Sequence, residues 1–411
     1  MNELTQKQAR TIIESVASNG TPPEYGIEFF TAGLDDYLSV IEEDYLDSYI
    51  ADGGSAFKLV VGVYGGGKTH FLYNVRNLAW RHNYVVSYVS LSQTESPFHQ
   101  LNTVYSAIAR GLTHPLNDDE LLNGYTKGIA SFLRREYKIR YADYIARGLP
   151  DHDVSNKVLR DVDARDLESI SFSKAVVAAS QALARNQEDA FQTICQWLSG
   201  EAYQSSIHKQ YGILEKIDKA TAFKMIRSLS AWIHHLKYNG LVILLDEAER
   251  VPSLSTKQRD QHLSNLREVI DACGQTNFQR VLMLYAVPDE NFLDGATQAY
   301  EALNQRLATV FETMNPYGVK IKLDDMEADE QRVKFLQEVG DKLARVFNVA
   351  NNCQFEEESL QETILAAAEY ANTQRFADSG YKRLFVQKLI RGLQYLRRAK
   401  AAPTIADFQS W

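Results

Sequence analysis

Apolar residues follow two rhythms along this chain, and the change of rhythm separates expected strands from expected helices. Short, nearly continuous apolar runs predict buried β-strands at 59–61, 84–91, 241–245, 280–287 and 319–323. Elsewhere apolar residues recur at helical spacing, which predicts helices at 2–18, 35–50, 330–346, 356–370 and 382–400. Strands that alternate with helices favour an α/β fold, in which helices cover both faces of a mostly parallel sheet.

The connection between the second and third strands is much longer than an ordinary crossover. It is rich in helix formers and aromatic residues and poor in Gly and Pro, so we expect it to form an inserted helical region. The predicted organisation is an N-terminal helical lead-in at 1–56, a core at 57–100 and 239–324, helical insertion at 101–238 and a C-terminal helical lid at 325–411.

A phosphate-binding loop is predicted directly after the first strand. Residues 62–69 read GVYGGGKT, the full G-x-x-x-x-G-K-[ST] pattern, between an apolar strand and a helical pattern. Glycines let the backbone aim its N–H groups at phosphates, and the helix N-terminus adds its positive dipole end. A Gly-rich turn with a chance Lys-Thr pair would not explain why motif and setting agree. The candidate nucleotide contacts are Gly62, Tyr64, Gly65, Gly66, Gly67, Lys68, Thr69 and His70.

Within this loop, Lys68 is expected to reach the β- and γ-phosphates of ATP, and the Thr69 hydroxyl to ligate Mg²⁺. Two acids, Asp246 and Glu247, follow the third strand. In P-loop ATPases the Asp in this place holds Mg²⁺, and the adjacent Glu polarises the attacking water. This pair favours ATP hydrolysis over phosphoryl transfer to a small molecule. The alternative is a strand end with two solvated acids.

Other parts of a nucleotide site are less clearly marked. The fourth strand does not end in the usual Asn, Thr or Ser sensor, which leaves Tyr285 and Asp289 as candidates. Arg306 lies on the helix before the fifth strand, where oligomeric AAA+ ATPases place an arginine finger; it is otherwise a surface or ion-paired arginine. Arg383 opens the last helix and is either a lid residue for the γ-phosphate or part of a solvated helix start.

Composition and charge exclude some classes of protein. The 411 residues carry a formal net charge of −9, with 45% hydrophobic and 24% charged residues, as in ordinary globular proteins. A uniformly basic nucleic-acid binder is therefore not expected. No apolar run has the length of a membrane span, and the first residues lack a signal-peptide core, so we expect a cytoplasmic protein without membrane contact. Three scattered cysteines argue against a zinc cluster or a disulfide framework.

Two local runs of basic residues contrast with the acidic whole. Such runs can meet the phosphate backbone of DNA, although a charge run on a helix is also typical of a solvated face. The first run contains Lys127, Arg134, Arg135, Lys138, Arg140 and Arg147, and the second contains Lys382, Arg383, Lys388, Arg391, Arg397, Arg398 and Lys400.

Several segments carry a family likeness: ARTIIE at 9–14, GTPP at 20–23, ESPFH at 95–99, WLSGE at 197–201, GLVILLDEAE at 240–249 and KRLF at 382–385. Together with the phosphate loop, they resemble the P-loop ATP-binding proteins of bacterial phage-defence islands, especially the ATP-binding component of bacteriophage-exclusion (BREX) systems. Lys382 departs from the pattern, since a proline is expected there. The resemblance implies an AAA+-like ATPase that uses ATP and Mg²⁺ as a homo-oligomer, or with other defence proteins or DNA.

Three functions are compatible with these patterns. The leading hypothesis is a Mg²⁺-dependent ATPase that acts as an oligomeric or partner-coupled switch in defence. The fourth strand lacks a standard polar sensor residue, and the net charge is negative. These two features support an alternative, an ATP-gated scaffold or DNA-binding module with little ATP hydrolysis. A small-molecule kinase is disfavoured by Glu247.

Overall fold

A six-stranded sheet forms the centre of the computed structural model, which describes residues 4–92, 96–162, 166–201, 203–246, 254–275, 277–288, 298–323, 329–374 and 380–411. The strand order is β3-β2-β4-β5-β1-β6, and all neighbouring strands are parallel except β2 and β3. The sheet is thus mixed and mostly parallel, and the expected α/β class is confirmed. The strands are β1 (Ser55–Val61), β2 (Val85–Ser90), β3 (Leu112–Thr113), β4 (Leu241–Asp246), β5 (Val281–Val287) and β6 (Lys320–Lys322).

Both faces of the sheet are buried, as near-continuous apolar strands require. Alternate residues such as Val60 and Leu244 pack with α3 (Lys68–Arg81) on one face. Their neighbours, such as Leu59 and Leu245, join a larger core on the other face. The helices of that second core include α4 (Leu101–Gly111), α11 (Ala222–His235) and α12 (Thr256–Gly274).

The segment before β1 contains α1 (Gln6–Asn19), η1 (Ile27–Phe29), α2 (Asp35–Val40) and η2 (Ile41–Tyr49). The single helix expected at 35–50 is therefore an α-helix that passes into a π-helix, η2. Hydrophobic spacing alone does not distinguish these two hydrogen-bond patterns over so short a stretch. The buried Lys58 of β1 ties this segment to the sheet, because its ammonium donates to the Tyr45 hydroxyl (2.6 Å) and to the Gly318 carbonyl (2.6 Å).

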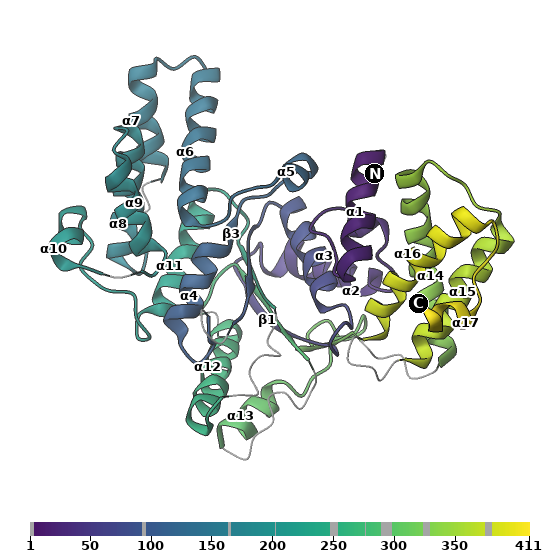
Figure 1. Ribbon diagram of the computed structural model, residues 1–411. Helices are drawn as coiled ribbons and strands as arrows, with labels where there is room; N and C mark the ends of the chain where they lie inside the picture. The colour runs from purple at the N-terminus through teal and green to yellow at the C-terminus, as the bar shows by residue number, and fades with distance from the viewer. Residues whose placement is uncertain are drawn as a thin grey trace.

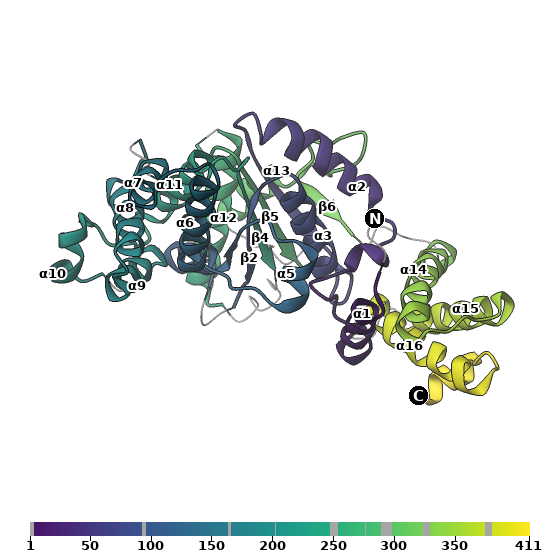
Figure 2. The same ribbon diagram turned by 90° about the horizontal axis from the view of Figure 1, so that it is seen from above.

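The segment between β2 and β4 is mostly helical, but it also contributes the short strand β3 to the sheet. Helices α4–α11 are called the inserted helices below. Figure 1 shows α6 and α7 projecting beyond the sheet, and Figure 2 shows these helices on the opposite side of the sheet from the C-terminus. In addition to α4 and α11, the inserted helices are α5 (Asp118–Asn123), α6 (Ile129–Ala146), α7 (Asp151–Val162), α8 (Ile170–Ala184), α9 (Glu188–Leu198) and α10 (Ser205–His208). The 3₁₀ turn η3 (Lys209–Tyr211) follows α10.

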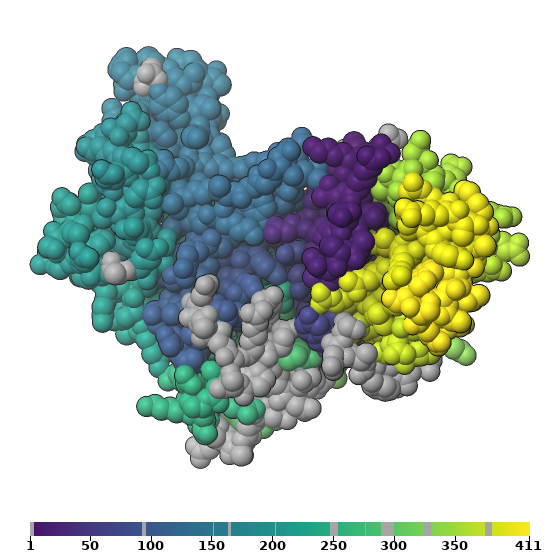
Figure 3. All heavy atoms as spheres, in the orientation of Figure 1, coloured from purple at the N-terminus to yellow at the C-terminus, as the bar shows by residue number. Residues whose placement is uncertain are grey.

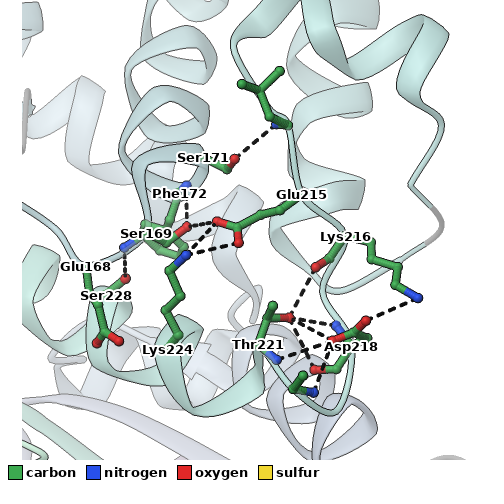
Figure 4. A network of polar contacts seen from close by, with 12 residues as sticks. Glu168, Ser169, Ser171, Phe172, Glu215, Lys216, Asp218, Thr221, Lys224 and Ser228 are labelled. Atoms are coloured by element: carbon green, nitrogen blue, oxygen red, sulfur yellow. Dashed lines mark hydrogen bonds and ion pairs between the residues drawn. The ribbon is translucent and has the colours of Figure 1, made fainter.

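A polar network fixes the connection between η3 and α11 against α8 (Figure 4). Ser169 caps α8 by accepting from the backbone N–H of Phe172 at 3.1 Å, and its hydroxyl donates to Glu215 at 2.6 Å. Lys224 of α11 donates to the same carboxylate at 3.0 Å. The cap and the ion pair together hold a long connection in one place.

The C-terminal helices, α14–α17, form a separate core that includes α1 from the other end of the chain. Figure 3 shows α1 lying directly against them. The Arg10 side chain donates to the Ala350 carbonyl at 3.0 Å across this contact. The C-terminal helices are α14 (Asp329–Asn351), α15 (Glu357–Thr373), α16 (Tyr381–Ala399) and α17 (Ile405–Ser410), and α13 (Gln298–Arg306) precedes β6.

Candidate functional site

The predicted phosphate loop connects the end of β1 to the start of α3. Gly65 and Gly67 adopt φ of +70° and +99°, the left-handed region that favours glycine. Gly67 is the N-cap of α3, so the first N–H groups and the positive end of the helix dipole face the loop. This arrangement is suited to an anion at the helix N-terminus.

Lys68 lies inside the loop, with a side chain that is 5% exposed. Its ammonium donates to the carbonyl oxygens of Gly62 at 2.8 Å and Val63 at 3.0 Å. The loop therefore holds the lysine close to the helix N-terminus. Lys68 lines the cavity described below, where its charge can meet a phosphate.

Thr69, at the start of α3, and Asp246, the last residue of β4, are brought together by the fold. The Thr69 hydroxyl donates to Asp246 Oδ2 at 2.7 Å, and Asp246 is 2% exposed. Both residues line the cavity. Hydroxyl and carboxylate oxygens are the hard ligands that Mg²⁺ prefers, so this donor set fits that ion.

A third residue of this cluster, Tyr88 of β2, was not anticipated from the sequence. Its hydroxyl donates to the same Asp246 Oδ2 at 2.6 Å. The sequence placed Tyr88 in the second strand. The periodicity of one strand, however, does not show which residues of another strand its side chains contact. Only the parallel pairing of β2 with β4 brings the two side chains within reach.

A cavity of about 480 Å³ opens above the phosphate loop, a size typical of small-ligand sites. Its walls come from the N-terminal segment, the loop and the C-terminal helices. The apolar part of the lining includes Phe30, Leu34, Tyr37, Phe335 and Leu336. The cavity thus combines apolar walls with the polar groups of the phosphate loop and Asp246.

His70 links the loop helix to the N-terminal segment. Its ring nitrogen Nε2 lies 2.8 Å from the Thr31 hydroxyl, and its ring lies 5.2 Å from that of Phe30. Burial, reinforced by the nearby Lys382 ammonium, lowers the pKa of His70 to about 4. The imidazole is therefore neutral at neutral pH; it lines the cavity and its observed partner is Thr31.

The start of α16 lies directly on the phosphate loop. Gly380 has a φ of +72°, and a Cβ there would come within 2.1 Å of the Tyr64 carbonyl oxygen. Arg383 donates to the Tyr64 hydroxyl at 2.7 Å and to the Asn19 carbonyl at 2.7 Å. Arg383 therefore contacts a side chain of the loop itself, and its role toward the γ-phosphate stays a prediction.

Lys382 is a second cation of α16 at the cavity. Its ammonium donates to the Gly66 carbonyl at 2.9 Å and to the Leu323 carbonyl at 3.0 Å. In the sequence, Lys382 is marked by its place in the second basic run and by the proline expected at its position. Its adjacency to Arg383 was the available signal, but helical spacing alone does not tell which of two neighbouring cations turns inward.

Arg306 is not among the described residues that line the cavity. Its guanidinium makes a two-pronged ion pair with Asp271 of α12, with Nη2 donating to Oδ2 at 3.0 Å. It also donates to the Ala302 carbonyl at 2.7 Å. A role toward a neighbouring subunit stays a prediction, and within one chain Arg306 ties α13 to α12.

The remaining sensor and base candidates have different outcomes. Tyr285 is fully buried, and its hydroxyl lies 3.1 Å from His262 Nε2 of α12 rather than among the lining residues of the cavity that the structure describes. Glu247 and Asp289 lie outside the described residues.

Five of the six residues of the first basic run form ion pairs with carboxylates. On α6, Arg140 contacts Glu136 at 3.1 Å and the Leu236 carbonyl at 2.8 Å. Similar pairs join Lys127 to Glu24, Arg134 to Glu188, Arg135 to Glu120 and Arg147 to Asp143. These pairs reduce the positive charge that the run could present to a partner.

Comparison with known protein families bears directly on this site. The family model described as BREX system ATP-binding protein BrxC/D matches residues 4–409. The chain belongs to this family. The match spans the N-terminal segment, the sheet, the inserted helices and nearly all of the C-terminal helices of this BREX ATP-binding family member. ATP binding within a BREX phage-defence system is what the family description gives for its members.

A search of the curated proteins found none that matches this BREX family member. Across the residues placed in the structure, no helix combines the length and the apolar composition needed to cross a bilayer.

Proposed function

We propose that this chain is a Mg²⁺-dependent ATPase with a P-loop fold of the AAA+-like branch, which works as an oligomeric or partner-coupled component of BREX defence. The proposal rests first on one contact, the hydrogen bond between Thr69 and Asp246 at the foot of the cavity. A phosphate-loop hydroxyl and an acid at the end of another strand of the same sheet, here β4, form the pair that positions Mg²⁺ in P-loop enzymes.

Each cavity residue takes a role that its position supports. The N–H groups of residues 65–69 and the Lys68 ammonium would bind the phosphates. Bound Mg²⁺ would neutralise part of the phosphate charge during hydrolysis. The apolar lining of Phe30, Tyr37 and Phe335 is suited to an adenine ring. Arg383 and Lys382 would contact the phosphate loop when the C-terminal lid is closed over it.

Steady-state ATP hydrolysis tests the proposal, with wild type beside Glu247→Gln across a range of protein concentrations. Glu247 follows Asp246 directly and is the proposed base for the attacking water. We expect Glu247→Gln to retain ATP binding and to lose about 10²- to 10⁴-fold in turnover. Equal turnover in the two proteins would remove Glu247 from the mechanism.

The ion pair of Arg306 with Asp271 supports a requirement for a partner. An arginine held in this way must exchange its partner before it can act on a neighbour's γ-phosphate. We therefore expect turnover per subunit to rise with protein concentration, and Arg306→Ala to abolish that rise. A turnover per subunit that is independent of concentration in both proteins would argue against a composite site.

The same ion pair favours the second candidate, an ATP-gated scaffold with little intrinsic hydrolysis. In that case the isolated chain binds ATP, and turnover stays negligible at every concentration, with or without double-stranded DNA. Brisk turnover by the isolated chain would exclude this candidate.

A further inference from the structure

Asp246 receives two hydroxyl donors on a single carboxylate oxygen. Thr69 donates to Oδ2 at 2.7 Å and Tyr88 donates to the same atom at 2.6 Å. Asp246 lines the cavity, whereas Tyr88 is absent from the lining residues that the structure describes. The two donors come from different elements, Thr69 from the start of α3 and Tyr88 from β2.

The sheet itself places Tyr88 there. In the parallel pairing of β2 with β4, Ser90 is aligned with Asp246 and Tyr88 with Leu244. The Tyr88 hydroxyl thus reaches along the sheet toward the end of β4. The Tyr88 ring packs against the ring of Tyr73 of α3, with centroids 5.0 Å apart. This contact restricts the movement of the ring that carries the hydroxyl.

Two donors on one oxygen restrict how the carboxylate can turn. An aspartate with one partner can rotate about its Cβ–Cγ bond, since that torsion has a broad energy profile. A second donor from a rigid strand restricts that rotation. Such outer partners of metal ligands typically contribute about 10- to 100-fold in metal affinity.

We propose that Tyr88 is a positioning residue that holds the Asp246 carboxylate in the orientation required for Mg²⁺. This inference rests on the proposed function, because it assigns a supporting residue to the same site. It differs from a packing role, in which the Tyr88 hydroxyl would serve only to satisfy a half-buried polar group.

The test compares nucleotide affinity with and without the metal. Isothermal titration calorimetry with ADP, in Mg²⁺ and then in EDTA, gives the ratio by which the metal strengthens binding. We expect Tyr88→Phe to reduce this ratio about 10-fold or more and to leave the affinity in EDTA unchanged. The ring and its contact with Tyr73 remain in this variant, which limits damage to the fold.

Tyr84→Phe is the matched control. Tyr84 directly precedes β2 and is fully buried, and its hydroxyl also donates a hydrogen bond of 2.6 Å, but to the Leu46 carbonyl. Each variant loses one hydroxyl that donates a hydrogen bond of 2.6 Å, so a general loss of stability would appear in both. Only Tyr88→Phe is expected to change the Mg²⁺ ratio. If Tyr88→Phe does not fold, Tyr88→Leu is measured in the same way.

A double-mutant cycle separates positioning from any direct effect on nucleotide. In the Asp246→Asn background the additional change Tyr88→Phe should alter the Mg²⁺ ratio less than 2-fold, because the group that Tyr88 holds has lost its charge. An unchanged ratio in Tyr88→Phe, or equal losses in the two backgrounds, would overturn the inference and leave the proposed ATP site intact. Failure of the wild type to bind ADP in either buffer would instead overturn the proposed function, and this inference with it.

Discussion

The phosphate loop and helix α6 both gather basic side chains, but the two regions use them in different ways. At the loop, Lys68, Lys382 and Arg383 come from two distant parts of the chain and line one cavity. On α6, the arginines contact carboxylates of the same helix or of neighbouring helices, as Arg140 does with Glu136. A run of like charges in the sequence is thus not by itself a binding surface.

The difference follows from where each region sits in the fold. The loop joins a buried strand to a helix N-terminus, where backbone N–H groups are left without intrahelical partners. Helix α6 lies along its own neighbours, so its long side chains reach acids close by. We therefore expect changes at the loop to alter ligand binding, and changes on α6 to alter stability.

The largest effect is expected from Lys68→Ala. Removing the charged donor that we propose binds the phosphates should lower ATP turnover about 10²- to 10³-fold. Arg135→Ala on α6 is the control, because it also removes a basic side chain but breaks only the pair with Glu120. Steady-state assays of both variants at matched concentrations would decide the comparison; equal losses would contradict it.

Glu136→Ala should produce the largest loss of stability on α6. The carboxylate is 3% exposed and accepts from the Tyr238 hydroxyl at 2.6 Å, from His114 and from Arg140. Its removal leaves these donors without their acceptor and should cost about 2–3 kcal/mol of unfolding free energy.

Asp143→Ala is the matched control, since Asp143 pairs with Arg147 on the exposed side of the same helix. We expect a change within about 0.5 kcal/mol there. Urea denaturation followed by circular dichroism measures both, and ATP affinity should stay at the wild-type value in both. Weaker ATP binding in Glu136→Ala would contradict the expectation that changes on α6 alter stability and leave ligand binding unchanged.

A smaller effect is expected from Arg383→Ala. Loss of the hydrogen bonds to the Tyr64 hydroxyl and the Asn19 carbonyl should loosen the contact between α16 and the loop, and should weaken ATP binding about 10-fold. Arg391→Ala, on the same helix but bonded to the Trp411 carbonyl, provides the control. Calorimetric titration of both variants with ATP would sharpen the boundary of the site; equal affinities would place Arg383 outside it.

The smallest effect concerns DNA. Because Arg134 is paired with Glu188, we expect Arg134→Ala to change affinity for double-stranded DNA less than about 3-fold. The measurement is a salt series of DNA binding for wild type and variant. A salt slope that falls by about 1 in the variant would reveal a phosphate contact and would reverse the assignment of α6.

Local patterns predicted the parts of the fold that depend on neighbouring residues. The strand before the phosphate loop, the loop itself and the helix after it lie where their spacing placed them. Strand β3 has two residues, too few to produce a period, and was missed. The short helix α17 was missed as well, and the expected helix at 35–50 gave no sign of its π-helical half.

The sequence by itself determined which residues form the loop and that Asp246 ends a buried strand, because a motif and a period of apolar residues are properties of adjacent positions. Tertiary structure alone decided the partners of those residues. Tyr88 reaches Asp246 because β2 pairs with β4, and Lys382 reaches Gly66 because α16 packs on the loop. Side chains far apart in the chain meet only when long-range packing sets their distance and direction, and no local pattern records that choice.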